Sequence, residues 1–195
     1  MSYILVLYSS HQGKVAQMAE LVAAGVRQTG MDVKIRQVPH VGPGFEGKSK
    51  VPQEGAAYAT CDDLRHADGL VMGSPGHFGN MTADLKHFID QTTPLWLSGD
   101  LINKPAAVFT STSSLHGGQE STLLSMMLPL FHHGMVLVGC PYSEAGLHHT
   151  QGGGTPYGAS HHTGSDGGRE IDTHEQSICH ALGQRVAELA KKMSS

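Results

Sequence analysis

Hydrophobic and polar positions alternate along this chain with two periods, one typical of strands and one of helices. Residues 4–8, ILVLY, are continuously apolar, as expected for a parallel strand that is covered on both faces. Apolar residues then recur at helical spacing over residues 15–26, which predicts an amphipathic helix. The chain therefore begins with a predicted buried strand that leads directly into a helix.

The same alternation continues toward the carboxyl terminus. Further strands are predicted at residues 32–38, 69–73, 106–110 and 135–138, and further helices at residues 80–91, 119–131 and 173–193. Strands that alternate with helices form parallel sheets with helices on both faces. We therefore expect an α/β fold, a flavodoxin-like doubly wound sheet of five parallel strands in the order 2-1-3-4-5, with its ligand at the carboxyl ends of the strands.

The length of 195 residues fits one domain, residues 1–195, with a single well-buried core. Residues 39–60 and 141–172 are too long to be simple connections between these elements. Loops of that length in a compact domain are usually functional or disordered.

Charge and composition exclude several classes of protein. The formal net charge is −4, so the chain lacks the basic footprint of a nucleic-acid-binding protein, and we expect no direct nucleic-acid partner. It contains no apolar run long enough for a membrane span, and we expect no signal peptide. The three cysteines are far apart and odd in number, which favours reduced thiols in a cytoplasmic protein.

The loop after the first strand is a candidate phosphate site. It contains hydroxyl groups at Ser9 and Ser10 and a cation at Lys14, and it ends at a helix N-terminus, where the helix dipole favours an anion. The loop matches neither the dinucleotide nor the triphosphate glycine motif. A single terminal phosphate, such as that of FMN, fits it better, and an ordinary strand-to-helix turn is the alternative.

The loops after the third and fourth strands are similar in character. In the first of them, Pro75 and Gly76 fix a tight backbone that can approach the edge of a planar ring, while His77 and Phe78 shape a wall. The second loop, residues 111–119, is rich in Ser and Gly. Because neighbouring parallel strands end at the same edge, the three loops are expected to surround one cofactor crevice.

One segment satisfies the P-loop pattern in its letters. In GPGFEGKS, Gly42, Gly47, Lys48 and Ser49 stand at the required positions. The mechanism requires a helix after the loop, yet the following residues contain Pro52 and Gly55 and show no helical period. A flexible surface loop is the favoured interpretation.

Fourteen histidines raise the question of a metal site. Three pairs are adjacent in sequence, at residues 132–133, 148–149 and 161–162, and adjacent residues do not face one ligand sphere. No HExxH, H-x3-H or C-x2-C pair accompanies them, so the sequence predicts no metal. The stripe Leu123, Met126, Met127 and Leu130 is interpreted as core or as a subunit contact.

Several motifs together carry a resemblance to a known family. They are VLYSSHQGK, GSPGHFGNM, LKHFIDQT with LW, FTSTSSLHGGQE, HHGM and GGTPYGAS, and they extend over essentially the whole chain. This set resembles the WrbA family of NAD(P)H:quinone oxidoreductases, the tryptophan repressor-binding proteins. The resemblance implies a homotetrameric FMN enzyme that takes hydride from NADH or NADPH and reduces quinones by two electrons.

The resemblance also assigns site residues. The FMN phosphate would be held by Ser10, His11, Gln12, Gly13, Lys14 and Val15. The edge of the isoalloxazine ring would be lined by Pro75, Gly76, His77, Phe78 and Gly79. The ribityl chain and ring would be followed by Ser111, Thr112, Ser113, Ser114, Leu115, His116 and Gly117. His132 corresponds to the histidine that contacts the flavin, with a catalytic role as hydrogen-bond donor, and Trp96 to the aromatic residue that frames the substrate cleft.

Several positions depart from the family pattern, and the loop after the fourth strand is one residue longer than in the family. Gln12 stands where an aromatic residue is common, and the pair Gly76 and His77 replaces a Thr-Arg pair, which removes a permanent charge.

The charge of the three loops bears on the type of redox chemistry. They contain no Asp or Glu but include His11, Lys14, His77 and His116, an environment that tolerates fully reduced, anionic FMN. This favours a two-electron ping-pong enzyme in which NAD(P)H and quinone use one cleft in turn. A flavodoxin-type one-electron carrier and a regulatory binding protein with weak FMN affinity remain as alternatives.

Overall fold

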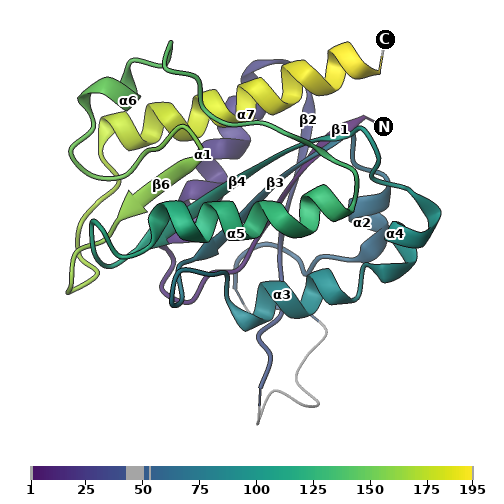
Figure 1. Ribbon diagram of the computed structural model, residues 1–195, viewed down its shortest axis with the longest axis horizontal. Helices are drawn as coiled ribbons and strands as arrows, with labels where there is room; N and C mark the ends of the chain where they lie inside the picture. The colour runs from purple at the N-terminus through teal and green to yellow at the C-terminus, as the bar shows by residue number, and fades with distance from the viewer. Residues whose placement is uncertain (1, 43–50, 53, 195) are drawn as a thin grey trace.

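A parallel sheet forms the middle layer of the molecule (Figure 1). The computed structural model describes residues 2–42, 51–52 and 54–194. The strands are β1 (Tyr3–Tyr8), β2 (Asp32–Gln37), β3 (Gly69–Pro75), β4 (Pro105–Thr112), β5 (Val136–Leu137) and β6 (Ala159–His162). The order β2-β1-β3-β4-β5 confirms the predicted topology, and β6 pairs with β4 in addition.

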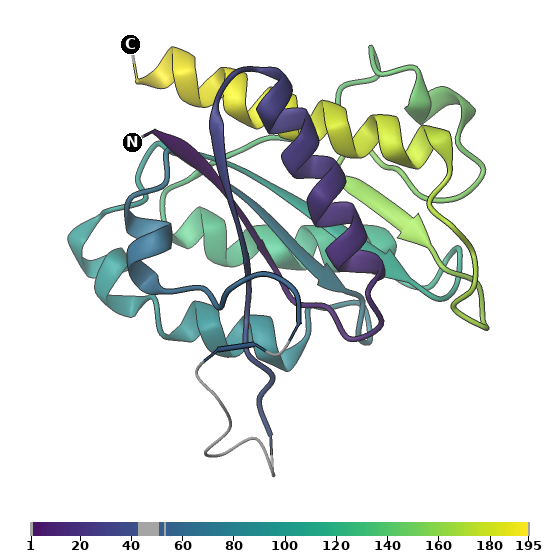
Figure 2. The same cartoon turned by 180° about the vertical axis from the view of Figure 1, so that it is seen from behind.

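Helices cover both faces of the sheet, as the sequence predicts (Figures 1 and 2). They are α1 (Lys14–Gln28), α2 (Cys61–Arg65), α3 (Ala83–Asp90), α4 (Thr93–Ser98), α5 (Gln119–His132), α6 (Gly146–His149) and α7 (Thr173–Met193). The buried side chains of α1 and α7 form one apolar cluster with the sheet, and those of α2, α3, α4 and α5 form the other.

The centre of the sheet is built from residues with little affinity for water. Every residue of β1 is buried, because β2 and β3 flank this strand and helices cover both of its faces. On one face, α1 and α7 approach closely at two glycines. A Cβ at Gly25 would collide with the carbonyl oxygen of His180, and one at Gly183 with that of Val22, so neither position has room for a side chain.

The helix predicted at residues 80–91 begins three residues later than expected. Thr82 caps it by accepting a hydrogen bond from the N–H of Leu85 at 3.3 Å. The residues before the cap are held in a turn by reciprocal backbone hydrogen bonds between His77 and Asn80. The segment between β3 and α3 therefore remains available as a loop at the edge of the sheet.

The predicted fifth strand, residues 135–138, is much shorter than expected. Only Val136 and Leu137 are paired, and they lie beside the amino-terminal half of β4. The carboxyl-terminal half of β4 pairs with β6 instead, in a register that aligns Phe109 with Ala159. Residues 141–172 were expected to be a loop, but they contain α6 and this sixth strand.

Three further predictions concern the apolar stripe at residues 123–130, the cysteines and the P-loop-like segment. Leu123, Met126 and Leu130 are buried in the core beneath α5, as predicted, and Met127 packs against the same cluster. Cys61, Cys140 and Cys179 are free thiols. Most of the P-loop-like segment lies at residues 43–50, outside the described residues, so its interpretation stays a prediction.

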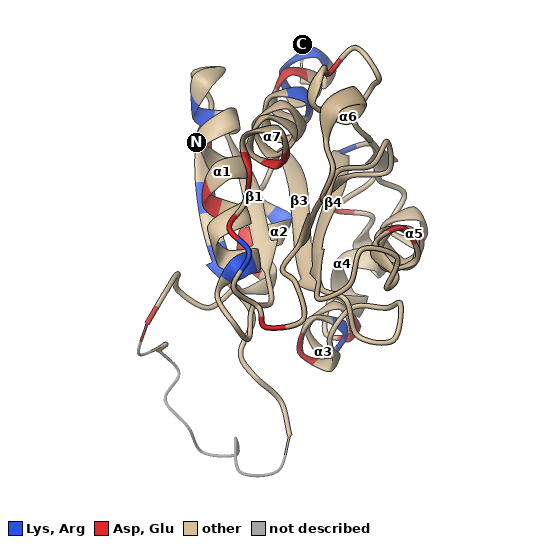
Figure 3. Ribbon diagram, turned by 90° about the vertical axis from the view of Figure 1, so that its left-hand side faces the viewer, with Lys and Arg blue, Asp and Glu red and all other residues tan. Residues whose placement is uncertain are grey.

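The surface carries charges of both signs. In Figure 3, basic and acidic residues occur together on α1, α3 and α7. Within residues 2–42, 51–52 and 54–194, the structure contains no helix with the length and apolar character needed to cross a bilayer.

Candidate functional site

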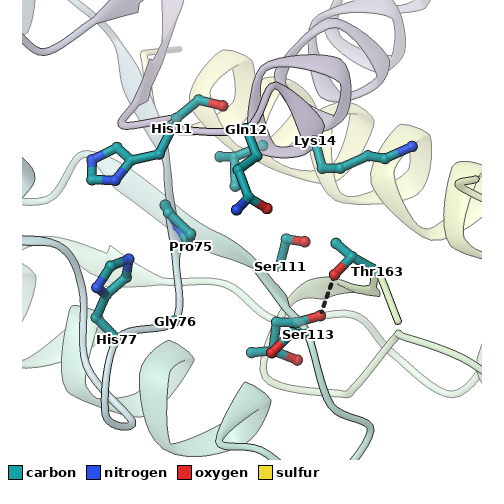
Figure 4. Close-up of a pocket in the computed structure, with 12 residues that line it drawn as sticks. His11, Gln12, Lys14, Pro75, Gly76, His77, Ser111, Ser113 and Thr163 are labelled. Carbon is teal, nitrogen blue, oxygen red and sulfur yellow. Dashed lines mark hydrogen bonds between the residues drawn. The ribbon is translucent and has the colours of Figure 1, made fainter. Parts of the chain in front are cut away.

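A cavity of about 240 Å³ opens at the carboxyl edge of the sheet, where β1, β3 and β4 end (Figure 4). Its lining residues are Ser10, His11, Gln12, Lys14, Val15, Pro75, Gly76, His77, Ser111, Thr112, Ser113 and Thr163. Parallel strands place their carboxyl ends at one edge, which explains why loops distant in sequence meet there. All three predicted loops contribute to this cavity.

The first wall is the loop between β1 and α1. The hydroxyl oxygen of Ser10 accepts hydrogen bonds from the N–H groups of Gly13 at 3.2 Å and Ala16 at 3.4 Å, which fixes the loop around the helix start. Gly13 caps α1 with a φ of +86°, a left-handed conformation that favours glycine. Lys14 is 12% exposed, and its Nζ lies 3.1 Å from a carboxylate oxygen of Glu170. The wall thus presents a helix N-terminus and one ammonium group.

The second and third walls are joined to each other. The N–H of Gly76, after β3, donates to the carbonyl oxygen of Ser111 at the end of β4. A Cβ at Gly76 would lie 2.9 Å from Cγ2 of Thr112 and 3.0 Å from Oγ1 of Thr122. The hydroxyl of Ser111 is buried and has no hydrogen-bond partner among the described residues. Because a buried hydroxyl without a partner is costly, this group is suited to bind a ligand.

A fourth wall was missed by the sequence reasoning. Thr163 follows β6, and both its N–H and its hydroxyl donate to the carbonyl oxygen of Thr112, at 2.9 and 3.3 Å (Figure 4). Residues 159–162, ASHH, contain only one apolar residue and show no apolar alternation, so the sequence contained no signal for a strand that would bring Thr163 to this edge.

Some predicted residues lie outside the cavity lining. Phe78 adopts a φ of +52° and is fully exposed, and Gly79 lies next to it in the same turn. Residues 113–117 form an exposed loop in which only Ser113 reaches the cavity. Gly13 shapes the first loop without lining the cavity. The other predicted site residues that do not line the cavity are Ser114, Leu115, His116 and Gly117.

His132 and Trp96 lie elsewhere in this chain. His132 is the last residue of α5, and α5 spans about 20 Å from the carboxyl edge of the sheet. Together with Trp96, which is 52% exposed, it lines a separate hollow of about 360 Å³ between α3, α4 and α5. Burial lowers the pKa of the neighbouring His133, whose Nε2 lies 2.9 Å from the hydroxyl of Thr92. The structure therefore brings His132 and Trp96 to each other but not to the cavity.

Comparison with known proteins gives one family match and several structural relatives. The model of a family described as NADPH-dependent FMN reductase matches residues 2–149. A flavodoxin, WrbA-like protein from Agrobacterium tumefaciens is similar in structure, with a TM-score of 0.70 and 22% identity over 98% of this chain and 99% of that one.

Two flavodoxins are also similar to this chain. One is from the domain Archaea, with a TM-score of 0.66 and 18% identity over 97% of this chain and 99% of its own. The other is flavodoxin 2 from Bacillus cereus, with a TM-score of 0.62 and 17% identity over 95% and 97%. At these identities the three structures establish the flavodoxin-like fold.

Proposed function

The chain belongs to the NADPH-dependent FMN reductase family, and on this premise we propose that it is a cytoplasmic FMN-dependent NAD(P)H:quinone oxidoreductase similar to the WrbA proteins. The observation that carries the proposal is the charge of the cavity wall. Among the described residues that line it there is no Asp or Glu, whereas Lys14, His11 and His77 are present. Lys14 is paired with Glu170 and His11 with Asp84, and both carboxylates lie outside the lining. The anionic, fully reduced flavin that two-electron transfer requires would therefore meet no carboxylate in direct contact.

The cavity residues fit FMN. A phosphate suits the first turn of α1, where N–H groups lack partners within the helix and Lys14 supplies a positive charge. The hydroxyl of Ser111, which has no partner in the described part of the chain, suits a polar atom of the ribityl chain or the ring. A Cβ at Gly76 would meet Thr112 and Thr122, so the close approach of the loops that form the cavity requires glycine at this position.

Bound in this cavity, FMN would supply the two-electron chemistry between NADH or NADPH and a quinone. The protein contributes position and electrostatics. The loops that end β3 and β4 are held together by the hydrogen bond from Gly76 to Ser111, so the walls of the cavity keep a fixed separation. NAD(P)H and quinone would occupy the same open side of the cavity in turn, in a ping-pong sequence.

An anaerobic titration of the FMN-saturated protein tests this function. We expect NADH or NADPH to convert oxidised flavin directly to the fully reduced form, and benzoquinone to restore the oxidised spectrum. Steady-state double-reciprocal plots should give parallel lines, with free FMN as the control. Intersecting lines, an abundant long-wavelength band of one-electron-reduced flavin, or no turnover with saturating FMN would each contradict the proposal.

We further propose that the active enzyme is a homotetramer in which His132 and Trp96 of a second copy complete the site. The cavity of about 240 Å³ is below the roughly 300–1,000 Å³ typical of ligand pockets, which supports a site that a second copy completes. Leu124, Leu128 and Phe131 leave an apolar stripe on α5 that is 44–60% exposed. A stripe of this kind is typical of a subunit contact.

A charge placed on this stripe tests the assembly. We expect Leu128→Asp to convert the tetramer to smaller species, because an unpaired carboxylate resists burial in an apolar contact. Sedimentation velocity measures the change, and quinone turnover should fall with it. Met193→Asp, at an exposed apolar position on α7, serves as the control and should leave both unchanged. A wild-type protein that sediments as a monomer while turning over quinone would rule out the assembly.

A further inference from the structure

His11, His40 and Asp84 come together beside the cavity from three separate parts of the chain. His11 lies in the loop between β1 and α1, His40 follows β2, and Asp84 lies in the first turn of α3. One ligand atom from each lies within 4.8 Å of the other two. Nε2 of His11 is 2.6 Å and Nδ1 of His40 is 2.9 Å from the same oxygen, Oδ2 of Asp84.

The carboxylate at the centre is held firmly. The side chain of Asp84 is only 6% exposed, and its second oxygen, Oδ1, accepts a hydrogen bond from the N–H of Val41 at 2.8 Å. The hydroxyl of Ser9 lies 3.5 Å from Oδ2. Such outer contacts orient the ligands of metal sites.

The surroundings of Asp84 also affect its pKa. Burial alone would raise the pKa of Asp84, but the hydrogen bonds from His11, Val41 and His40 outweigh it and hold the pKa below its usual value.

The histidine side of the cluster faces solvent. The side chains of His11 and His40 are 40% and 43% exposed, so an ion can enter and water can occupy the remaining coordination positions. His77 lies next to them, with its ring centroid 5.6 Å from that of His11. The cluster therefore combines a buried carboxylate with two partly exposed imidazoles.

We propose that Nε2 of His11, Nδ1 of His40 and the carboxylate of Asp84 form a binding site for a divalent transition metal of the zinc type. Two imidazoles and one carboxylate are a common ligand set for such ions, with an open position for water. Two imidazoles disfavour Mg²⁺ and Ca²⁺, which select oxygen ligands. The site rests on these contacts alone and does not depend on the proposed function.

The geometry requires only a small rearrangement. Ligand atoms about 2.0–2.1 Å from a tetrahedral zinc ion are separated by about 3.3 Å, so the two hydrogen-bonded pairs must each open by less than about 1 Å. The two nitrogens, which lie within 4.8 Å of each other, must reach about the same separation. The ion takes the lone pairs of the two nitrogens. A proton that either nitrogen now shares with Asp84 must leave or move to the other ring nitrogen.

Short sequence spacings give no signal for this cluster. Asp84 is 73 residues from His11 and 44 from His40, so only the fold brings them together. A filled site would tie the loop that ends β1 to α3. Because His11 also lines the cavity, the ion would stabilise one wall of the candidate flavin site.

Zinc titration of the chelator-stripped protein in phosphate-free buffer tests the site. We expect one equivalent of Zn²⁺ to bind tightly, and His40→Ala and Asp84→Asn each to weaken it by more than about 100-fold, since loss of an outer contact alone costs about 10- to 100-fold. His149→Ala, at an exposed histidine of another pair, is the matched control and should bind like the wild type.

A second measurement guards against misfolding of the Asp84 variant. Co²⁺ substituted at the site should show visible absorption bands typical of nitrogen and oxygen ligands in the wild type, and these should disappear in His40→Ala, whose half-exposed side chain is not part of the core. Equal zinc affinity in the wild type and in His40→Ala, or no stoichiometric binding by the wild type, would overturn the proposal.

Discussion

Glu175→Ala is expected to lower the free energy of unfolding by about 3–5 kcal/mol, because it leaves buried partners without their counter-charge. Glu175 is fully buried at the start of α7. Its carboxylate lies 2.9 Å from Nδ1 of His161, accepts a hydrogen bond from the N–H of Gly153 at 2.7 Å, and pairs with the guanidinium of Arg169 at 2.8 Å. Thermal or urea unfolding measures the loss.

Glu175 also makes the free energy of unfolding depend on pH. Burial alone would raise the pKa of Glu175, but hydrogen bonds from His161, Asp172, Arg169 and Gly153 lower it from 4.5 to about 2. Because the pKa of Glu175 is lower in the folded state, the contribution of Glu175 to the free energy of unfolding is complete above pH 4.5. This contribution is lost as the pH falls toward 2. The wild type should therefore lose about 3 kcal/mol over this range from this group, and Glu175→Ala should not.

Glu188→Ala is the matched control, since Glu188 is exposed on the same helix. It should change the unfolding free energy by less than about 0.5 kcal/mol. If Glu175→Ala and Glu188→Ala have the same free energy of unfolding, then the buried network does not anchor β6 to α7.

This network explains why part of the fold could not be predicted. The sequence predicted β1, β3 and β4 because apolar side chains bury these strands on both faces. In contrast, β6 is buried through polar groups: Ser160 donates to Oε1 of Gln119, and His161 contacts Glu175. Polar residues that become buried through distant partners leave no hydrophobic period, so the segment was interpreted as loop.

The candidate site, like the fold, could be predicted only in part. Loops directly after apolar strands could be placed at one edge by the rules of parallel sheets, and Ser10, Pro75 and Ser111 line the cavity there. Thr163 was missed because its strand was missed. The resemblance grouped His132 with these loops, but α5 carries it away from them within one chain.

Gly76→Val is expected to weaken FMN binding by about 10- to 100-fold. The added side chain would meet Thr112 and Thr122, whose short, branched side chains have little freedom to move. The conflict is relieved only if the loop after β3 moves away from Ser111, to which Gly76 is hydrogen-bonded. FMN binding with the loop in its present position would restore this conflict, and overpacking of this kind costs about 1–3 kcal/mol. Each 1.4 kcal/mol lost from the binding free energy corresponds to about a tenfold weaker affinity.

Fluorescence quenching of FMN during titration measures this effect, and the thermal midpoint of the apoprotein reports whether the variant folds. Gly168→Val is the matched control, because a Cβ at this exposed glycine would be in ordinary contact with Asp166, at 3.4 Å or more. This control should bind FMN like the wild type. A folded Gly76→Val protein with unchanged affinity would mean that the cavity between β3 and β4 is not where the flavin binds, and the charge argument for two-electron chemistry would lose its basis.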